Sequence, residues 1–203
     1  MDSLLAVKAI FRFLLSFALS ILVGSSLLAG MAQAQESSSN STVKVRLIGP
    51  NGLLTEPVAV PRVTKTNAEW RKQLTAEQYE IARGQGTEPA FCGTLLDNHR
   101  EGIYHCVCCG LPLFASDSKF NSGTGWPSFF QPVAKENVIT RTDESFGMSR
   151  TEIICARCGA HLGHVFDDGP APTGLRFCLN SAALTFVDKG KEVPEVVPSA
   201  QAK

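Results

Sequence analysis

Four cysteines of this chain form two pairs whose spacing is typical of metal ligands. The pairs are Cys106-x-x-Cys109 and Cys155-x-x-Cys158, and a glycine follows each pair. Each C-x-x-C-G segment can make a tight turn that the glycine relieves, and two such turns complete a tetrahedron of thiolates. Because cysteine would fill all four positions, the spacing predicts a structural zinc site. Cys108 is then a spare thiol, since only Cys109 shares the following glycine with Cys158.

Three alternatives to the zinc site use the same residues. The pairs could form disulfides, they could be redox-active C-x-x-C motifs, or the second pair could bind metal together with His161 and His164. Disulfides would not explain why both pairs carry the same glycine. A redox motif of the thioredoxin type would need a βαβ context that the sequence lacks. The four-cysteine site is therefore favoured, and it would join the two halves of the fold.

A lone cysteine, Cys178, lies in the stretch GLRFCLNSAALTF near the C-terminus. If this stretch is a strand, Arg176, Cys178 and Asn180 share one face, whereas Phe177 and Leu179 share the other. A guanidinium beside a thiol favours the thiolate, which is the nucleophilic form. The alternative is that Cys178 is a small core residue, as lone strand cysteines usually are.

Two histidines and a tryptophan add side chains suited to proton transfer and binding. His161 and His164 lie three residues apart in HLGHVF and could exchange protons near neutral pH. Taken singly, each histidine is more often structural than catalytic. Trp126 lies between a glycine-rich turn and a proline in SGTGWPSFF, a poor context for an ordinary core residue. We expect Trp126 to form the wall of a small apolar pocket.

The elements that position these residues are mostly short β-strands. Two short helices come first: one begins at Asn67 and places Trp70 and Leu74 four residues apart, and the next begins with a capping box of Thr75 and Gln78. After these helices the sequence alternates strand-like segments with turns rich in Gly, Pro, Asp and Asn. The pattern predicts a mainly β fold, an antiparallel core with small helices in front.

The first 34 residues have the composition of a secretory signal peptide. Lys8 and Arg12 precede the apolar run FLLSFALSILVGSSLLAG, and Ala32-Gln33-Ala34 resembles a cleavage site. An uncleaved membrane anchor is the alternative, because the run approaches the length of a spanning helix. We expect cleavage, a secreted or periplasmic location, and no membrane association afterwards.

The rest of the chain is long enough for one domain with a hydrophobic core. We expect residues 35–66 to form a linker and an extended arm, residues 67–188 to form the domain, and residues 189–203 to form a flexible tail. The chain has 19 Lys+Arg and 19 Asp+Glu, so its formal net charge is zero. This balance offers no basic field for nucleic acid, and we expect a monomer that binds none.

Several motifs together carry a resemblance to a known family. GWPSF, the two C-x-x-C-G pairs, HLGHVFDDGP and GLRFCLNSAAL resemble motifs of the methionine-R-sulfoxide reductase B family, over about residues 67–188. The resemblance implies a fold of two antiparallel β-sheets with small peripheral helices and a structural zinc. It also implies reduction of methionine-R-sulfoxide, free or in oxidised proteins, to methionine. Such a reaction repairs proteins under oxidative stress.

The resemblance also implies roles for individual residues. Cys178 would be the nucleophile that attacks the sulfoxide sulfur and becomes a sulfenic acid. By the same resemblance, His161 and His164 would be the acid and hydrogen-bonding groups. Trp126 would pack on the methyl group of the substrate. Arg176 and Asn180 would organise the site around the sulfur. One departure concerns Thr124, which stands where many members have a cysteine.

A sulfenic acid needs a partner thiol if a protein reductant is to regenerate the enzyme through a disulfide. Cys92, in AFCGT, lies in a glycine-flanked segment, and a subset of the resembling family places its second cysteine in this region. We therefore expect a Cys92–Cys178 disulfide that a thioredoxin-like donor reduces. Cys108 is the competing partner, and an inert Cys92 in the core is the alternative.

Two other functions use the same residues. A thiol–disulfide oxidoreductase would use Cys92 and Cys178 on protein disulfides, and turnover of a sulfoxide distinguishes the reductase from it. A zinc-ribbon binding module would leave Cys178 in the core. Such a module is favoured by a basic surface or an exposed aromatic platform, and the sequence indicates neither.

Overall fold

The structure, a computed structural model, describes residues 41–191 of the 203-residue chain. The predicted signal peptide at residues 1–34 and most of the predicted tail at residues 189–203 lie outside the described residues. Between residues 41 and 191, no helix has the length and apolar character needed to cross a membrane.

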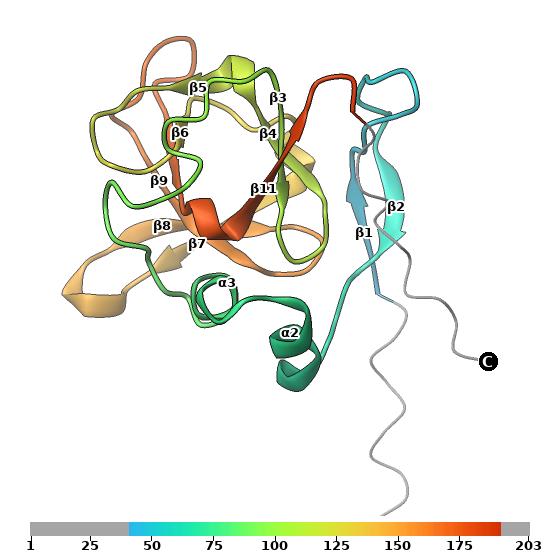
Figure 1. The fold of residues 1–203 in the computed structure, drawn as a ribbon, viewed down its shortest axis with the longest axis horizontal. Helices are drawn as coiled ribbons and strands as arrows, with labels where there is room; N and C mark the ends of the chain where they lie inside the picture. Colours follow the sequence, from blue (N-terminus) through green and yellow to red (C-terminus); the bar gives the residue numbers. More distant parts are fainter. Residues whose placement is uncertain (1–40, 192–203) are drawn as a thin grey trace, which may run out of the picture. The chain divides into compact units, whose positions relative to one another are not determined.

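Strands dominate the described part of the chain (Figure 1). The strands are β1 (Thr42–Val45), β2 (Val58–Pro61), β3 (Gly102–Cys106), β4 (Pro112–Ala115), β5 (Lys119–Phe120), β6 (Ser128–Phe129), β7 (Val138–Asp143), β8 (Arg150–Cys155), β9 (His161–Phe166), β10 (Arg176–Leu179) and β11 (Leu184–Asp188). The helices are α2 (Asn67–Gln73), α3 (Ala76–Ala82) and the short 3-10 turns η1 (Ser116–Ser118), η2 (Lys135–Asn137), η3 (Ser145–Gly147) and η4 (Ser181–Ala183).

Within residues 41–191 the strands form three sheets, and every pairing in them is antiparallel. The largest sheet has the order β5-β6-β10-β9-β8-β7, and a three-stranded sheet has the order β11-β3-β4. The third sheet is the β1–β2 pair from the predicted arm. The expectation of a mainly β fold with antiparallel sheets and small helices is confirmed.

Both predicted helices form, and each begins with a capping box. Thr75 and Gln78 satisfy each other's backbone N–H groups at the start of α3, as the sequence predicts. Thr66 and Glu69 do the same at the start of α2. Trp70 and Leu74, the two residues that the sequence places four apart, are both buried. Helix α3 contacts β9 and η4 and buries Tyr79, Ile81 and Ala82, so it packs against the strand that carries His161 and His164.

An aromatic cluster joins the two larger sheets. Tyr104 on β3 and Phe114 on β4 contact Phe129 on β6, each with ring centroids 4.9 Å apart. Phe114 also lies 5.6 Å from Phe177 on β10. Such pairs contribute roughly 0.5–1.5 kcal/mol each beyond area burial. Because Phe177 points into this cluster, the next side chain, Cys178, must point to the opposite face of the sheet.

The β1–β2 arm is fastened to the second C-x-x-C-G turn. The Arg62 Nη1 donates to the Ala156 carbonyl at 3.1 Å, and the Val63 N–H donates to the Arg157 carbonyl at 3.0 Å. On β1, Val45 is fully buried. The predicted arm is therefore packed on the rest of the described fold.

The stretch GLRFCLNSAALTF differs from a single long strand. It divides into β10 and β11, which belong to different sheets, and η4 separates them. The physical cause is Glu88, a buried carboxylate that accepts the N–H groups of Ser181 at 2.6 Å and Ala182 at 3.0 Å. These bonds hold the first turn of η4, so β10 ends at Leu179 and Asn180 lies beyond it.

Candidate active site

Cys178 lies on β10, which is hydrogen-bonded to β6 on one side and to β9 on the other. In the strand register it lies opposite Ser128 of β6 and His164 of β9. Phe177 and Leu179 are buried, whereas Cys178 is only half-buried. The predicted alternation of Phe177, Cys178 and Leu179 along β10 is confirmed, whereas Asn180, which was predicted on the same strand face as Cys178, lies beyond the end of β10 and is buried.

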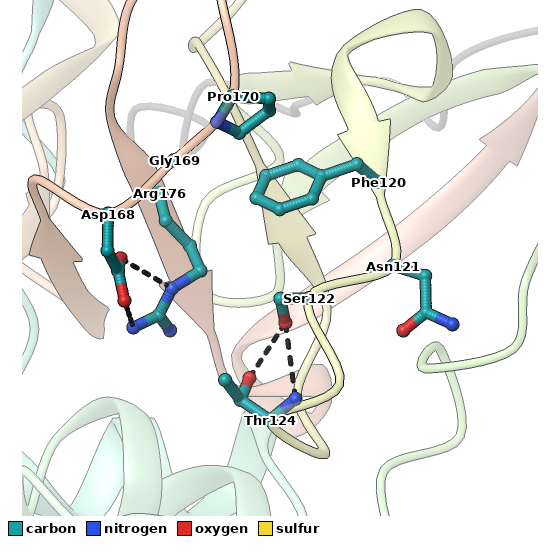
Figure 2. A pocket seen from close by; sticks show the side chains of 8 residues that line it. All are labelled: Phe120, Asn121, Ser122, Thr124, Asp168, Gly169, Pro170 and Arg176. Atoms are coloured by element: carbon teal, nitrogen blue, oxygen red, sulfur yellow. Dashed lines mark hydrogen bonds and ion pairs between the residues drawn. The ribbon is translucent and has the colours of Figure 1, made fainter.

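Arg176 is held beside Cys178 by a carboxylate. Its Nε donates to Asp168 Oδ1 at 2.8 Å, and an Nη donates to Asp168 Oδ2 at 2.9 Å (Figure 2). This two-point geometry fixes the plane of the guanidinium, which also stacks on the Phe166 ring at 4.3 Å. Sequence reasoning missed Asp168, although its position in the HLGHVFDDGP motif was a signal that could have found it.

A chain of hydroxyl groups leads to the thiol. Ser122 Oγ lies 2.7 Å from Ser128 Oγ and 2.8 Å from Thr124 Oγ1. Thr124 Oγ1 in turn lies 3.9 Å from Cys178 Sγ, within reach of a weak hydrogen bond to sulfur. The turn before GWPSF therefore places a hydroxyl beside Cys178.

The ionisation of Cys178 reflects opposing effects. Burial raises the pKa of the Cys178 thiol, while the hydrogen bond from Thr124, the charge of Arg176 and the hydroxyl of Ser128 act in the opposite direction. The net pKa lies above its ordinary value. The free protein therefore holds Cys178 mainly as the thiol at neutral pH, and Arg176 offsets part of the cost of forming the thiolate.

The raised pKa of Cys178 predicts how alkylation depends on pH. Because only the thiolate reacts, the rate of Cys178 alkylation by iodoacetamide should rise with pH and continue rising above pH 9. Peptide mass spectrometry at a series of pH values measures this rate, with N-acetylcysteine as the reference thiol. A plateau below pH 8 would contradict the prediction.

A β-bulge brings the two histidines together. In a regular strand His161 and His164, three residues apart, would point to opposite faces. The register between β8 and β9 shifts at this point, so that Leu162 has no partner residue on β8. This extra residue restores a common face, and the two imidazole ring centroids lie 5.4 Å apart.

Gly163 allows β9 to approach β10 closely. A Cβ atom at this position would lie 2.0 Å from the carbonyl oxygen of Cys178, far inside any permitted contact. Only glycine therefore fits between the strands here. The close approach aligns His164 with Cys178 in the register.

Each histidine is held by its own carboxylate. His161 Nδ1 lies 2.6 Å from Glu152 Oε1, and His164 Nε2 lies 2.8 Å from Asp143 Oδ2. Burial lowers the pKa of His161, although the hydrogen bond to Glu152 acts in the opposite direction. Hydrogen bonds from Ser145 and His164 hold the pKa of Asp143 well below its usual range. The sequence analysis singled out neither carboxylate.

Trp126 and Asn180 are connected through Glu88. Trp126 Nε1 donates to the Glu88 carbonyl at 3.0 Å, and the Glu88 N–H donates to Asn180 Oδ1 at 3.0 Å. Asn180 Nδ2 donates to the Leu162 carbonyl at 3.2 Å. The amide of Asn180 thus joins the Glu88 segment to β9. Glu88 is a second residue that sequence reasoning missed, and its backbone sets the orientation of Trp126.

An open cavity of about 360 Å³ is lined by Thr124 and Arg176, the two residues next to Cys178, although Cys178 itself does not line it. Figure 2 shows the Asp168–Arg176 pair on one wall and Phe120, Ser122 and Thr124 on the other. Its size suits a small ligand. Within the described structure, Trp126 lines an adjoining cavity of about 220 Å³ that shares Phe120 and Ser122 with the first. Most of the other residues that line this second cavity are polar or charged, among them Asp97, His99 and Lys119, so it is not the apolar pocket that was predicted around Trp126.

The predicted four-cysteine cluster is confirmed. The Sγ atoms of Cys106, Cys109, Cys155 and Cys158 all lie within 4.8 Å of one another, and all four residues are buried. Two of the Sγ–Sγ separations are 3.6 and 3.5 Å. Ligands about 2.3 Å from a tetrahedral zinc lie about 3.8 Å apart, so four thiolates here fit a metal ion.

The glycines of the two turns behave as predicted. Gly110 and Gly159 adopt φ values of 69° and 70°, and their N–H groups donate to the first cysteine of each pair at 2.8 and 2.9 Å. The left-handed conformation favours glycine, which explains why both pairs carry it. All seven cysteines fall within residues 41–191, and none forms a disulfide there. The alternative in which His161 and His164 bind the metal is not supported, because carboxylates hold both rings.

Comparisons with known proteins agree with this arrangement. The SelR domain family matches residues 74–188. The chain is 57% identical over 125 residues to the peptide methionine sulfoxide reductase MsrB of Hahella chejuensis, which covers 62% of this chain and 90% of that protein. The MsrB of Thiobacillus denitrificans is 58% identical over 125 residues, covering 62% and 95% of the two chains. That of Methanosarcina barkeri is 50% identical over 140 residues, covering 68% and 99%.

The chain belongs to the methionine-R-sulfoxide reductase B family. The SelR match begins at residue 74, so the β1–β2 arm and α2 lie before it. In this family member Thr124 occupies the turn beside Cys178. By the sequence resemblance, this is the position at which many members have a cysteine. A hydroxyl cannot form a disulfide, so any partner thiol for Cys178 within this chain would have to come from another segment.

Two thiols outside the metal cluster are candidates for that partner. Cys92 is exposed. The N–H of the residue before it, Phe91, donates to the Gly125 carbonyl at 2.8 Å. This bond places the Cys92 segment against the turn that carries Thr124. Cys108 is 3% exposed and belongs to the buried core around the metal cluster. The structure of this reductase family member therefore gives Cys92 the better access.

Proposed function

We propose that this protein is a peptide-methionine (R)-S-oxide reductase that reduces methionine-R-sulfoxide, free or in oxidised proteins, with Cys178 as nucleophile. The observation that carries the proposal is the arrangement around β10. A half-buried thiol lies beside an arginine that Asp168 orients, and opposite a histidine held by a carboxylate. Membership of the family supplies the substrate class.

The first chemical step transfers the sulfoxide oxygen to Cys178. The thiolate attacks the sulfoxide sulfur and forms a transient S–S bond. As this bond and the S–O bond of the substrate break, the oxygen passes to the Cys178 sulfur and becomes the hydroxyl of a sulfenic acid. The substrate sulfur gains two electrons and Cys178 loses two, and one proton is taken up by the oxygen. One of the two histidines, His161 or His164, supplies that proton and the other hydrogen-bonds the oxygen, while Arg176 stabilises the thiolate before attack. Trp126 would pack on the substrate methyl group.

The second step regenerates the thiol through Cys92. The Cys92 thiolate attacks the sulfenic sulfur, a Cys92–Cys178 disulfide forms, and the oxygen leaves as water. A thioredoxin-like dithiol then reduces this disulfide and becomes oxidised itself. The proposal is supported by the exposure of Cys92 and by the contact of its segment with the Thr124 turn.

Cys92→Ser should separate these two steps. We expect the variant to release one methionine per enzyme in a single turnover, to lose turnover with thioredoxin, and to retain some turnover with dithiothreitol. The reason is that a small thiol can reach the sulfenic acid directly, whereas a protein reductant needs an exposed disulfide. Peptide mapping after one turnover of the wild type should show a Cys92–Cys178 link. A Cys108–Cys178 link, or full thioredoxin-supported activity in Cys92→Ser, would remove Cys92 from the mechanism.

We further propose that the four-cysteine cluster holds a structural zinc ion. Cys106, Cys109, Cys155 and Cys158 would bind it, and it would link the three-stranded sheet to the six-stranded sheet through their connecting turns. With four thiolates it has no open position for substrate. Its contribution is to the stability of the sheet that carries Cys178 and the histidines.

The composition of residues 1–34 supports a proposal of export. A secreted or periplasmic reductase would meet oxidised proteins in an oxidising compartment, where an enzyme disulfide accumulates unless a dedicated donor reduces it. Fractionation of cells that express the full chain tests this, and N-terminal sequencing of the exported protein should begin at Gln35. Retention of the uncleaved chain in the cytoplasm would refute it.

One assay decides the proposed function. The purified protein is incubated with dithiothreitol and either the R or the S epimer of methionine sulfoxide, and methionine is measured. Consumption of the R epimer alone supports the proposal. Consumption of the S epimer, or of neither, would exclude it. A thiol–disulfide oxidoreductase would instead reduce a protein disulfide substrate without consuming sulfoxide.

A further inference from the structure

Glu152 is a buried carboxylate that contacts His161, one of the two histidines of the site. It lies on β8 and is 2% exposed. Its Oε1 accepts from His161 Nδ1 at 2.6 Å and from Gln85 Nε2 at 3.2 Å, and its Oε2 pairs with Arg141 Nε. Burying a carboxylate is costly unless its charge is compensated. Every partner of Glu152 therefore contributes to keeping an ionised group next to the His161 ring.

The Glu152 contact decides which nitrogen of His161 is free. Burial acts to raise the pKa of Glu152, but hydrogen bonds from Arg141, His161 and Gln85 outweigh it and lower the pKa. An ionised carboxylate only accepts hydrogen bonds, so Nδ1 of His161 must carry a hydrogen. Nε2 of His161 is buried and has no hydrogen-bond partner among the described residues. Such an orphaned atom is uncommon and indicates a place for a ligand atom or water.

The side chains around the His161 ring act on its pKa in both directions. The charged and titratable side chains around His161 come from three strands: Glu152 on β8, Asp143 and Arg141 on β7, and His164 on β9. On the next strand, Cys178 lies opposite His164. With the two ring centroids 5.4 Å apart, a positive charge on His164 would act to lower the pKa of His161. Glu152 and Asp143 act to raise that pKa, although burial keeps it below its ordinary value overall.

We propose that Glu152 is a positioning residue of this active site, which holds the His161 ring by Nδ1 and so makes Nε2 the nitrogen that exchanges a proton with the substrate oxygen. The inference rests on the proposed function. During reduction, the N–H at Nε2 of the imidazolium gives its proton to the sulfoxide oxygen, directly or through one water. The neutral ring then takes a proton from solvent before the next turnover. Glu152 stays ionised throughout and touches no reacting atom.

Glu152→Gln keeps the size of the side chain and removes its charge. In single-turnover reduction of the R epimer, we expect the maximal rate to fall by about 10- to 100-fold with little change in the half-saturating substrate concentration. The rate requires the protonated ring, so it falls as pH rises through the pKa of His161. Losing the carboxylate lowers that pKa, and the high-pH limb of the rate profile should move to lower pH by at least about one unit.

Arg141→Met should move the high-pH limb of the rate profile in the opposite direction. It removes the cation that neutralises Glu152 and leaves the contact with His161 intact. The carboxylate then favours the imidazolium more strongly, so the limb should move to higher pH. Because Arg141 is largely exposed, this variant should fold even if Glu152→Gln does not. Glu144→Gln, an exposed carboxylate on the β7–β8 connection, is the matched control and should leave the profile unchanged.

Nitrogen-15 NMR of the imidazole rings tests the positioning without turnover. In the wild type, Nδ1 of His161 should remain protonated across the titration while Nε2 gains and loses its hydrogen. A neutral ring with the hydrogen on Nε2, or rate limbs that shift in neither variant, would overturn the proposal. If the wild type reduces neither epimer, the proposed function fails, and the NMR titration still decides whether Glu152 sets the tautomer of His161.

Discussion

Cys178→Ser is expected to abolish reduction of methionine-R-sulfoxide with every reductant, by at least about 1,000-fold. The serine hydroxyl is nearly the size of the thiol, so the packing of β10 should persist. Its oxygen, however, cannot take the sulfoxide oxygen and form a sulfenic acid. The measurement is single-turnover release of methionine from the R epimer, because this step requires no second thiol and no reductant.

The matched control for this prediction is Cys92→Ser, which should still release one methionine per enzyme. Metal content and melting temperature of Cys178→Ser should equal those of the wild type, since Cys178 lies outside the four-cysteine cluster. Appreciable turnover by a folded Cys178→Ser protein would show that another residue is the nucleophile. Loss of the fold would instead reveal a packing role for the half-buried thiol.

Cys158→Ser is expected to remove the bound metal and with it the cooperative fold. The apparent free energy of zinc binding at structural sites of this kind is about 10–16 kcal/mol. A domain of this size is stable by only about 5–15 kcal/mol, so losing a ligand should leave little net stability. Metal analysis of the purified protein and circular dichroism during thermal unfolding provide the two measurements.

Cys108→Ser is the matched control, because Cys108 lies in the same buried core but outside the cluster of four. It should retain one metal ion per chain and lose at most about 2 kcal/mol of stability. Cys109→Ser, one residue further on, should behave like Cys158→Ser. A metal-free Cys158→Ser protein with unchanged melting would contradict a structural role for the metal.

The cysteine cluster shows what local sequence can determine. A C-x-x-C-G turn is specified by its own few residues. The glycine adopts a positive φ, and its N–H donates to the carbonyl of the first cysteine, Cys106 or Cys155, so both features arise within the turn. The choice of Cys109 over Cys108 followed from that local geometry. The same holds for the capping boxes of the two helices and for the alternation of Phe177 and Cys178. In each case the interacting groups lie within a few residues of one another.

The site around Cys178 depended on contacts between distant segments. Sequence periodicity alone would separate His161 from His164, and only the bulge against β8 placed both rings on one face. Arg176 was predicted beside Cys178, but its orientation depends on Asp168, which reaches it from the loop after β9.

The sequence by itself determined the family, the four metal-ligand candidates and the alternation that puts Cys178 and Phe177 on opposite faces of β10, because motifs and short-range geometry carry that information. Only the tertiary structure decided that Asn180 joins the Glu88 segment to β9, and that Glu152 holds His161. Those contacts join residues on different strands and loops, and strand register fixes them. Register follows from packing of whole sheets through the aromatic cluster, which no single stretch of sequence specifies.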